Sequence, residues 1–173
     1  MENKKENILI TKEQIEKRIV ELGAEISRDY QGKKLYVLSL LRGSFIYTAD
    51  LVRQISVPTK IGFMTTSSYG HDEVSSGVVK IVNDIPDDIE GYDVLVVDDI
   101  VDTGITMKFV IDHVASLGAK SVKSCVLLDK PERRKVDIKP DYCCFEIPDI
   151  FVVGYGLNYG DYYRNIPYVF NWE

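Results

Sequence analysis

The sequence predicts an α/β fold: one domain with a mostly parallel central sheet flanked by helices. Three observations lead to this prediction. Nearly continuous apolar runs at residues 35–41 and 94–97 are typical of strands covered on both faces. Helical patterns alternate with such runs along the chain, which favours parallel strands joined by crossovers. The 173 residues contain no linker, repeat or low-complexity segment, which predicts a single domain over residues 1–173.

The first half of the chain begins with a helix and continues with strands. Thr11 and Gln14 form a capping-box signature, and apolar residues then recur at helical spacing, so we expect a helix over 12–30. Gly32 is suited to end that helix. The elements expected next are a strand at 35–41, a helix at 45–55 capped by Ser44, a strand at 60–66, a Ser- and Gly-rich mobile loop at 67–77 and a strand at 78–82.

The second half repeats the strand–helix order. A buried strand at 94–97 leads into an acidic loop at 98–104, and a helix follows from Thr106 to Gly118. The remaining expected elements are a strand at 122–128, a charged turn at 130–135, and strands at 142–147 and 151–153.

Composition excludes several classes of protein. The chain has 21 Lys and Arg against 27 Asp and Glu, a net charge of −6, which argues against a nucleic-acid binder. No apolar run reaches the roughly 20 residues that span a bilayer, and the polar N-terminus has no signal-peptide pattern, so we expect a cytoplasmic protein without membrane contact. Three cysteines without metal-type spacing are expected to be reduced, and two histidines make a structural zinc site improbable.

The segment VLVVDDIVDTGIT at 94–106 is the most informative one. Its apolar run places Asp98 and Asp99 at the carboxyl end of a central strand, where open α/β sheets bind ligands. Three carboxylates within five residues repel one another unless a cation or hydroxyl donors meet them. Gly104 and the following helix start favour a phosphate. The segment therefore predicts a sugar-phosphate pocket, and the alternative is a solvated acidic turn.

Other phosphate and acid motifs do not fit. No Gly-Lys-Ser/Thr follows this strand, which excludes a P-loop. The aspartates at 98, 99 and 102 lack the one-residue separation of an aspartyl-nucleophile phosphatase. No strand is followed by G-x-G-x-x-G, so a dinucleotide-binding domain is excluded as well.

The 94–106 segment resembles the phosphoribosyl-pyrophosphate motif of type I phosphoribosyltransferases. Further segments in the same order resemble the hypoxanthine-guanine phosphoribosyltransferases over residues 8–170: LLRGS, SSYG, LLDKPERRK, FEIPDIFVVGYGLNY and YYRN. The resemblance implies transfer of a ribose phosphate from phosphoribosyl pyrophosphate to a 6-oxopurine with Mg²⁺. It also implies a small hood at the C-terminal edge of the sheet and a homodimer or homotetramer.

The resemblance assigns the phosphoribosyl-pyrophosphate site. Asp98, where the family more often has Glu, and Asp99 would hold the ribose hydroxyls directly or through Mg²⁺. A cis peptide is implied between residues 41 and 42. The 5′-phosphate would be cradled by Asp102, Thr103, Gly104, Ile105 and Thr106, and the pyrophosphate bound by Leu41, Arg42, Gly43 and Arg164.

Asp102 and Lys130 resemble the two residues that act on the purine. Asp102 matches the proposed general base near an imidazole-ring nitrogen, and the alternative is a helix-capping role. Lys130 matches the donor to the 6-oxo group, and the alternative is a solvated turn lysine. A cationic donor at this position would select a carbonyl over the amino group of adenine.

The remaining assignments concern the purine ring and the closing segment. Ile100 and Phe151 match the side chains that sandwich the base, with ordinary core positions as the alternative, and the backbone of Val152 would read the purine edge. Ser68 and Tyr69 match the lid. Asn158 stands where the family more often has Asp, near a second magnesium, so the sequence lacks one negative charge there.

A second function remains open at this point. A regulator built on the same fold would use the sugar-phosphate site to sense metabolites and would bind RNA or DNA. Its mark would be a basic face, whereas the net charge here is −6. Retention on heparin at moderate salt separates the two functions.

Overall fold

The computed structural model describes residues 7–68 and 78–172 and contains a six-stranded central sheet. Its strand order is β4-β3-β2-β5-β6-β7, and only β4 runs antiparallel to its neighbour. This arrangement confirms the predicted α/β class. The strands are β2 (Leu35–Leu41), β3 (Thr59–Ser68), β4 (Val79–Asn83), β5 (Asp93–Val101), β6 (Ser121–Asp129) and β7 (Tyr142–Glu146).

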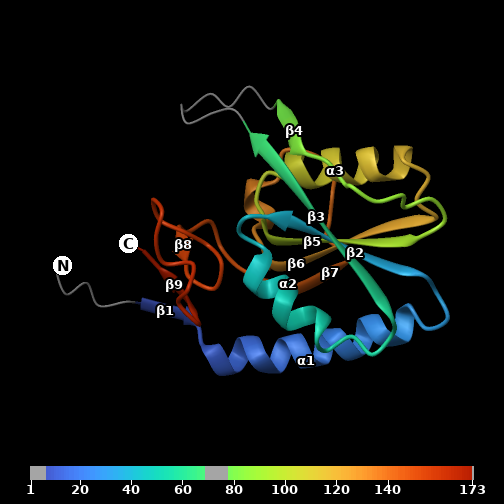
Figure 1. The fold of residues 1–173 in the computed structure, drawn as a ribbon. Helices are drawn as coiled ribbons and strands as arrows, with labels where there is room; N and C mark the ends of the chain where they lie inside the picture. Colours follow the sequence, from blue (N-terminus) through green and yellow to red (C-terminus); the bar gives the residue numbers. More distant parts are fainter. Residues whose placement is uncertain (1–6, 69–77, 173) are drawn as a thin grey trace.

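Helices cover both faces of this sheet. In Figure 1, α1 (Lys12–Asp29) and α2 (Phe45–Val52) lie on one face and α3 (Ile105–Ser116) lies on the other. The sheet therefore separates two apolar clusters: Val37 and Leu95 pack toward α1 and α2, whereas Leu38 and Val96 pack toward α3. Because alternate residues of each strand enter opposite clusters, the central strands read as continuous apolar runs.

The capping box predicted for α1 is confirmed. Gln14 N donates to Thr11 Oγ1, and Thr11 N donates to Gln14 Oε1. The helix ends at Asp29, with Tyr30 as its cap, slightly before the predicted end. Gly32 follows in the left-handed conformation at φ 75°, where a side chain would be strained.

A second, three-stranded sheet forms the hood. Its order is β1-β9-β8, built from β1 (Asn7–Ile10), β9 (Val169–Asn171) and β8 (Val152–Val153). Figure 1 shows it beside the main sheet. The hood was predicted from the resemblance, but β1 and β9 were not predicted, because strands of four and three residues are too short for a periodic signal.

The acidic segment was wrongly predicted to be a loop from residue 98. β5 continues through Val101, with Asp98 paired to Val126 and Ile100 to Leu128 of β6. Parallel pairing along β6 satisfies the backbone, and this outweighs the low strand preference of aspartate. The aspartates therefore lie on a rigid strand end.

The segment around α2 differs from the prediction in two details. α2 ends at Val52, not at residue 55, and turn bonds from Gln54 N and Ile55 N follow it. Ser44 is the N-cap residue of α2, as predicted, but its side chain makes no capping hydrogen bond. Its hydroxyl lies buried between Leu40 O, to which it donates, and Ser39 Oγ, at 2.7 Å.

The first two residues of the segment predicted to be a loop at 67–77 lie in a strand. Ser67 and Ser68 extend β3, because they pair with Lys80 and Val79 of β4. Tyr69, assigned to the lid, and the rest of that segment lie outside the described residues.

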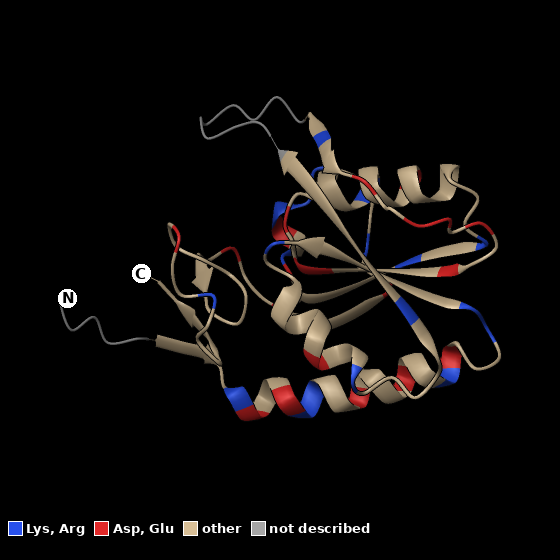
Figure 2. Cartoon of the chain, viewed as in Figure 1, with Lys and Arg blue, Asp and Glu red and all other residues tan. Residues whose placement is uncertain are grey.

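Basic and acidic residues are interspersed along the chain. Figure 2 shows basic and acidic residues alternating along α1, and no side of this view carries basic residues alone. Within residues 7–68 and 78–172, no helix combines the length and the apolar character needed to cross a membrane.

Candidate active site

A cavity of about 120 Å³ lies at the carboxyl end of β5, where the predicted sugar-phosphate pocket was expected. β5 and the start of α3 supply its walls. The lining residues are Asp98, Ile100, Val101, Asp102, Thr103, Gly104, Thr106 and Met107. The structure thus brings most of the predicted 98–106 residues to one place.

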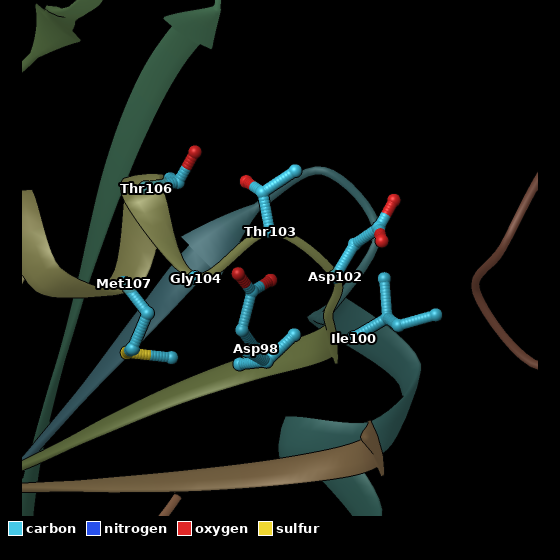
Figure 3. Close-up of a pocket in the computed structure, with 8 residues that line it drawn as sticks. Asp98, Ile100, Asp102, Thr103, Gly104, Thr106 and Met107 are labelled. Carbon is cyan, nitrogen blue, oxygen red and sulfur yellow. The ribbon is translucent and has the colours of Figure 1, made fainter. Parts of the chain in front are cut away.

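The cavity has two sides that differ in chemistry. Figure 3 shows the Asp98 carboxylate pointing toward the loop of Thr103, while Asp102 and Ile100 project together to the side opposite Thr106 and Met107. One side therefore offers hydroxyls and a helix start, and the other offers a carboxylate beside an apolar side chain. This separation suits a ligand that is polar at one end and planar at the other.

Gly104 shapes the phosphate side. It sits at φ 82°, directly before α3, and a Cβ there would approach Ile138 Cγ2 to 2.5 Å. Only glycine combines this conformation with such close packing. The first N–H groups of α3 have no partners within the helix, and Thr103 Oγ1 accepts from Ile105 N at 3.4 Å. These groups and the helix dipole favour an anion.

Asp98 and Asp99 form an acidic pair whose negative charges are electrostatically unfavourable. Burial raises the pKa of both carboxyls, and the charge of Asp99 raises the pKa of Asp98 further. Arg164 acts in the opposite direction on the pKa of Asp99, so its guanidinium lies within electrostatic reach. A cation beside the pair would stabilise both carboxylates.

The acidic pair fits magnesium that is held jointly with a substrate. In the part of the chain that the structure describes, no group of three His, Cys, Asp or Glu side chains could form an all-protein metal site. Magnesium is usually bound by one or two carboxylates together with substrate phosphates and water. Asp98 and Asp99 supply such a pair beside the phosphate side of the cavity.

The loop after β2 closes against this pair. The peptide bond between Leu41 and Arg42 is cis, as the resemblance implied, and Arg42 is exposed. Gly43 lies so close to Asp99 that a Cβ would come within 1.8 Å of its Oδ2. Gly156 of the hood packs on the carbonyl oxygen of Gly43, which a Cβ at Gly156 would approach to 2.1 Å.

Arg164 joins the hood to this loop. Its Nη1 donates to Gly156 O at 2.6 Å, and Gly156 N donates back to Arg164 O at 2.9 Å. Through Gly156, the arginine is placed next to the loop of Gly43 and near Asp99. Three segments far apart in sequence therefore converge at the predicted pyrophosphate site.

Lys130, predicted to contact the purine, lies beside the end of β5. This lysine is only 8% exposed, so it is not a solvated turn residue. Its backbone N–H donates to Val101 O at 2.9 Å, which fixes it beside the end of β5, and its Nζ lies 4.0 Å from Asp149 Oδ1. Among the described residues its ion-pair partner is the distant Asp149, so the ammonium can donate to a carbonyl of a ligand.

The predicted ring-stacking residues differ in their surroundings. Phe151 is 46% exposed and meets Tyr159 edge-on at 6.0 Å between ring centroids, so it is not an ordinary core residue. Ile100 is half-buried and packs partly against the α1–α2 cluster. Val152 is buried in β8, and Asn158 Nδ2 donates to Gly160 O within the hood.

Sequence reasoning missed three residues of this site. Arg133 Nε donates to Asp102 Oδ1 at 3.0 Å, Arg134 Nη1 donates to Asp102 O at 2.9 Å, and Asp149 lies between Lys130 and Arg133. The LLDKPERRK segment was the available signal for the two arginines, but in that segment only Lys130 was assigned a role.

Comparison with known proteins decides the family. The phosphoribosyl transferase domain model matches residues 7–160. The chain belongs to the phosphoribosyltransferase family. The resemblance stated from the sequence motifs is therefore confirmed.

Curated members of this family cover nearly the whole chain. Hypoxanthine-guanine phosphoribosyltransferase of Aquifex aeolicus is 49% identical over 168 residues, 96% of this chain and 94% of that protein. The Bacillus subtilis protein of the same name is 45% identical over 164 residues, with 95% and 91% covered.

A solved phosphoribosyltransferase has the same fold. A hypoxanthine phosphoribosyltransferase from Staphylococcus aureus is 43% identical, covers 95% of this chain and 90% of its own, and superposes with a TM-score of 0.92. The agreement extends to the hood because the matched region spans almost the entire chain.

Proposed function

We propose that this chain is a purine salvage enzyme that transfers the 5-phosphoribosyl group from phosphoribosyl pyrophosphate to hypoxanthine or guanine, giving IMP or GMP and pyrophosphate. The observation that carries the proposal is the two-sided cavity at the end of β5, with an acidic pair and helix start on one side and Asp102 near Lys130 on the other. Relatives named for this activity match almost the full chain.

The ribose phosphate would bind along the phosphate side of the cavity. Asp98 and Asp99 accept hydrogen bonds from the ribose hydroxyls or hold magnesium, while the backbone of 103–106 and the Thr hydroxyls take the 5′-phosphate. When bound, magnesium offsets the negative charge of the departing pyrophosphate. Arg42 and Arg164 would contact that pyrophosphate from the β2 loop and the hood.

Asp102 would act as the general base. It accepts the ring N–H proton of the purine, and the electron pair left on nitrogen forms the new bond to C1 of the ribose. The C1–oxygen bond breaks with its electron pair going to pyrophosphate. Because the transition state carries positive charge at the ribose ring, the negative carboxylate also stabilises it electrostatically.

Purine selection would rest on Lys130. Its ammonium donates to the 6-oxo group, whereas the 6-amino group of adenine would present a second donor. Ile100 and Phe151 would enclose the ring, and the backbone of Val152 would read its far edge. Asn158 would lie near a second magnesium, with one charge fewer than an aspartate.

Assembly and location complete the proposal. We propose one phosphoribosyltransferase domain over 1–173, assembled as a homodimer or homotetramer. Phe45, Ile61 and Phe63 support the assembly because they are between 41% and 50% exposed on α2 and β3, the two elements that flank β2. Light scattering measures the oligomeric state. A reducing cytoplasm is supported by the three free cysteines.

The direct test is incubation with phosphoribosyl pyrophosphate, magnesium and one of four purines: hypoxanthine, guanine, xanthine or adenine. Nucleotide formation and pyrophosphate release are measured together. Turnover with hypoxanthine or guanine and none with adenine is expected. Turnover of adenine alone, or of no purine, would refute the proposal.

A further inference from the structure

A chain of alternating charges connects Lys130 to Asp102, which lines the cavity. Lys130 Nζ lies 4.0 Å from Asp149 Oδ1, Asp149 Oδ2 lies 3.6 Å from Arg133 Nη1, and Arg133 Nε lies 3.0 Å from Asp102 Oδ1. The two proposed purine-contacting groups are therefore linked through two residues that have no assigned role. We propose that Arg133 is a positioning residue, which holds the Asp102 carboxylate by one oxygen so that the other faces the purine N–H.

The local fold explains why Arg133 reaches Asp102. Pro131 begins a short 3₁₀ turn, Pro131–Arg133, and Arg133 N donates to Lys130 O at 3.1 Å. This turn reverses the chain directly after β6. β6 is paired with β5 up to Val101, so the turn lies over the residue that follows β5, which is Asp102.

Two neighbouring arginines divide the contacts with Asp102. Arg134 is a structural anchor: its side chain is 15% exposed, it forms an ion pair with Asp129, and it donates to the backbone carbonyl of Asp102. Lys135 N adds a bond to Thr103 O at 2.9 Å. These contacts fix the backbone of the loop, whereas Arg133 contacts the carboxylate itself through a hydrogen bond that orients it.

The geometry matches that of an oriented general base. A base is effective when a third group fixes its rotamer and leaves one atom free toward the substrate. Arg133 Nε occupies Oδ1 of Asp102, and Figure 3 shows this carboxylate projecting into the side of the cavity shared with Ile100. The hydrogen bond with Asp102 also raises the pKa of Arg133, so its guanidinium keeps its charge throughout the reaction.

Asp149 extends this orientation to Lys130. Its side chain is 44% exposed and lies between the two cations, so it also restrains Arg133. The 4.0 Å separation from Lys130 is at the limit of an ion pair, and the ammonium can turn to a 6-oxo group without breaking a short bond. This inference rests on the roles proposed above for Asp102 and Lys130.

The test is a double-mutant cycle on steady-state kinetics. Arg133→Gln keeps an N–H donor but removes the charge and the Nε geometry, and it is expected to lower kcat about tenfold while the KM for phosphoribosyl pyrophosphate changes less than twofold. Arg133→Lys is expected to recover only part of kcat, because a point charge does not reproduce the planar donor. Lys108→Gln is the matched control, since Lys108 also forms an exposed ion pair, with Asp112 on α3.

The cycle separates this inference from the proposed function. If Arg133 acts through Asp102, Arg133→Gln has no further effect in an Asp102→Asn background. A tenfold loss that persists in that background, or wild-type kcat in Arg133→Gln, would overturn the inference but leave Asp102 as base. Wild-type kcat in Asp102→Asn alone would overturn both. Because Arg133 is half-exposed, thermal unfolding of the variant should match wild type.

Discussion

Replacing Gly43 with alanine is expected to damage the site while leaving the fold intact. The new Cβ would stand 1.8 Å from Asp99 Oδ2, whereas ordinary contact begins near 3.4 Å. The β2 loop and the acidic pair therefore have to separate by roughly 1.5 Å. Gly43 is not in the left-handed region, so the backbone itself tolerates alanine, and the clash involves a side chain at the edge of the site.

The expected loss follows from the size of this separation. A displacement of about 1 Å in a positioned reactant group can lower a rate about 100-fold. We expect kcat/KM for phosphoribosyl pyrophosphate to fall by about that factor and the magnesium concentration for half-maximal rate to rise. Initial rates over a magnesium series, with thermal unfolding in parallel, measure both effects.

Gly32→Ala is the matched control for this experiment. Gly32 has no atom within 4 Å of an added Cβ but has φ 75°, so alanine there should cost about 1 kcal/mol of stability and no activity. Activity of Gly43→Ala within threefold of wild type at every magnesium concentration would refute the contact between the loop and the acidic pair.

Three further variants test other parts of the site. Lys130→Met should lower kcat/KM for hypoxanthine about 10- to 150-fold, because it removes one charged hydrogen bond worth about 1.5–3 kcal/mol. The ratio of kcat/KM for hypoxanthine to that for adenine should also fall, and an unchanged ratio would show that Lys130 does not select the purine. Asn158→Asp should lower the magnesium requirement by up to about tenfold, and superimposable magnesium curves for the two proteins would show that residue 158 has no part in metal binding. Arg134→Met should destabilise the fold by about 3 kcal/mol in urea unfolding, because it leaves Asp129 buried without its partner; a loss below about 1 kcal/mol would contradict the anchoring role.

The sequence predicted the fold wherever the pattern is local and repeated. β2 begins and ends at the predicted residues because its apolar run is continuous, and the capping box of α1 is a contact between near neighbours. The ends of β5 and β3 were predicted too early, since pairing with β6 and β4 keeps aspartate and serine in a strand. The strands β1 and β9 pair with each other although nearly the whole chain separates them in sequence, and a local sequence pattern cannot predict such pairing.

The candidate site divides in the same way. Asp98, Asp102 and Thr106 could be placed together because they follow one another along a strand end and a helix start. The contact of Gly43 with Asp99, and of Arg133 with Asp102, depends on where a loop and a turn fold back. Such contacts are set by tertiary packing, so they could not be predicted from the sequence pattern.

We propose that phosphoribosyl transfer takes place at the end of β5 with Asp102 as the general base, and the variant Asp102→Asn tests this directly. The measurement is kcat with hypoxanthine beside the dissociation constant for phosphoribosyl pyrophosphate, determined by calorimetry with magnesium present. We expect kcat to fall about 10²- to 10⁴-fold, as for the loss of a general base, while the dissociation constant stays within a few-fold of wild type. A variant that turns over at nearly the wild-type rate would contradict the proposal.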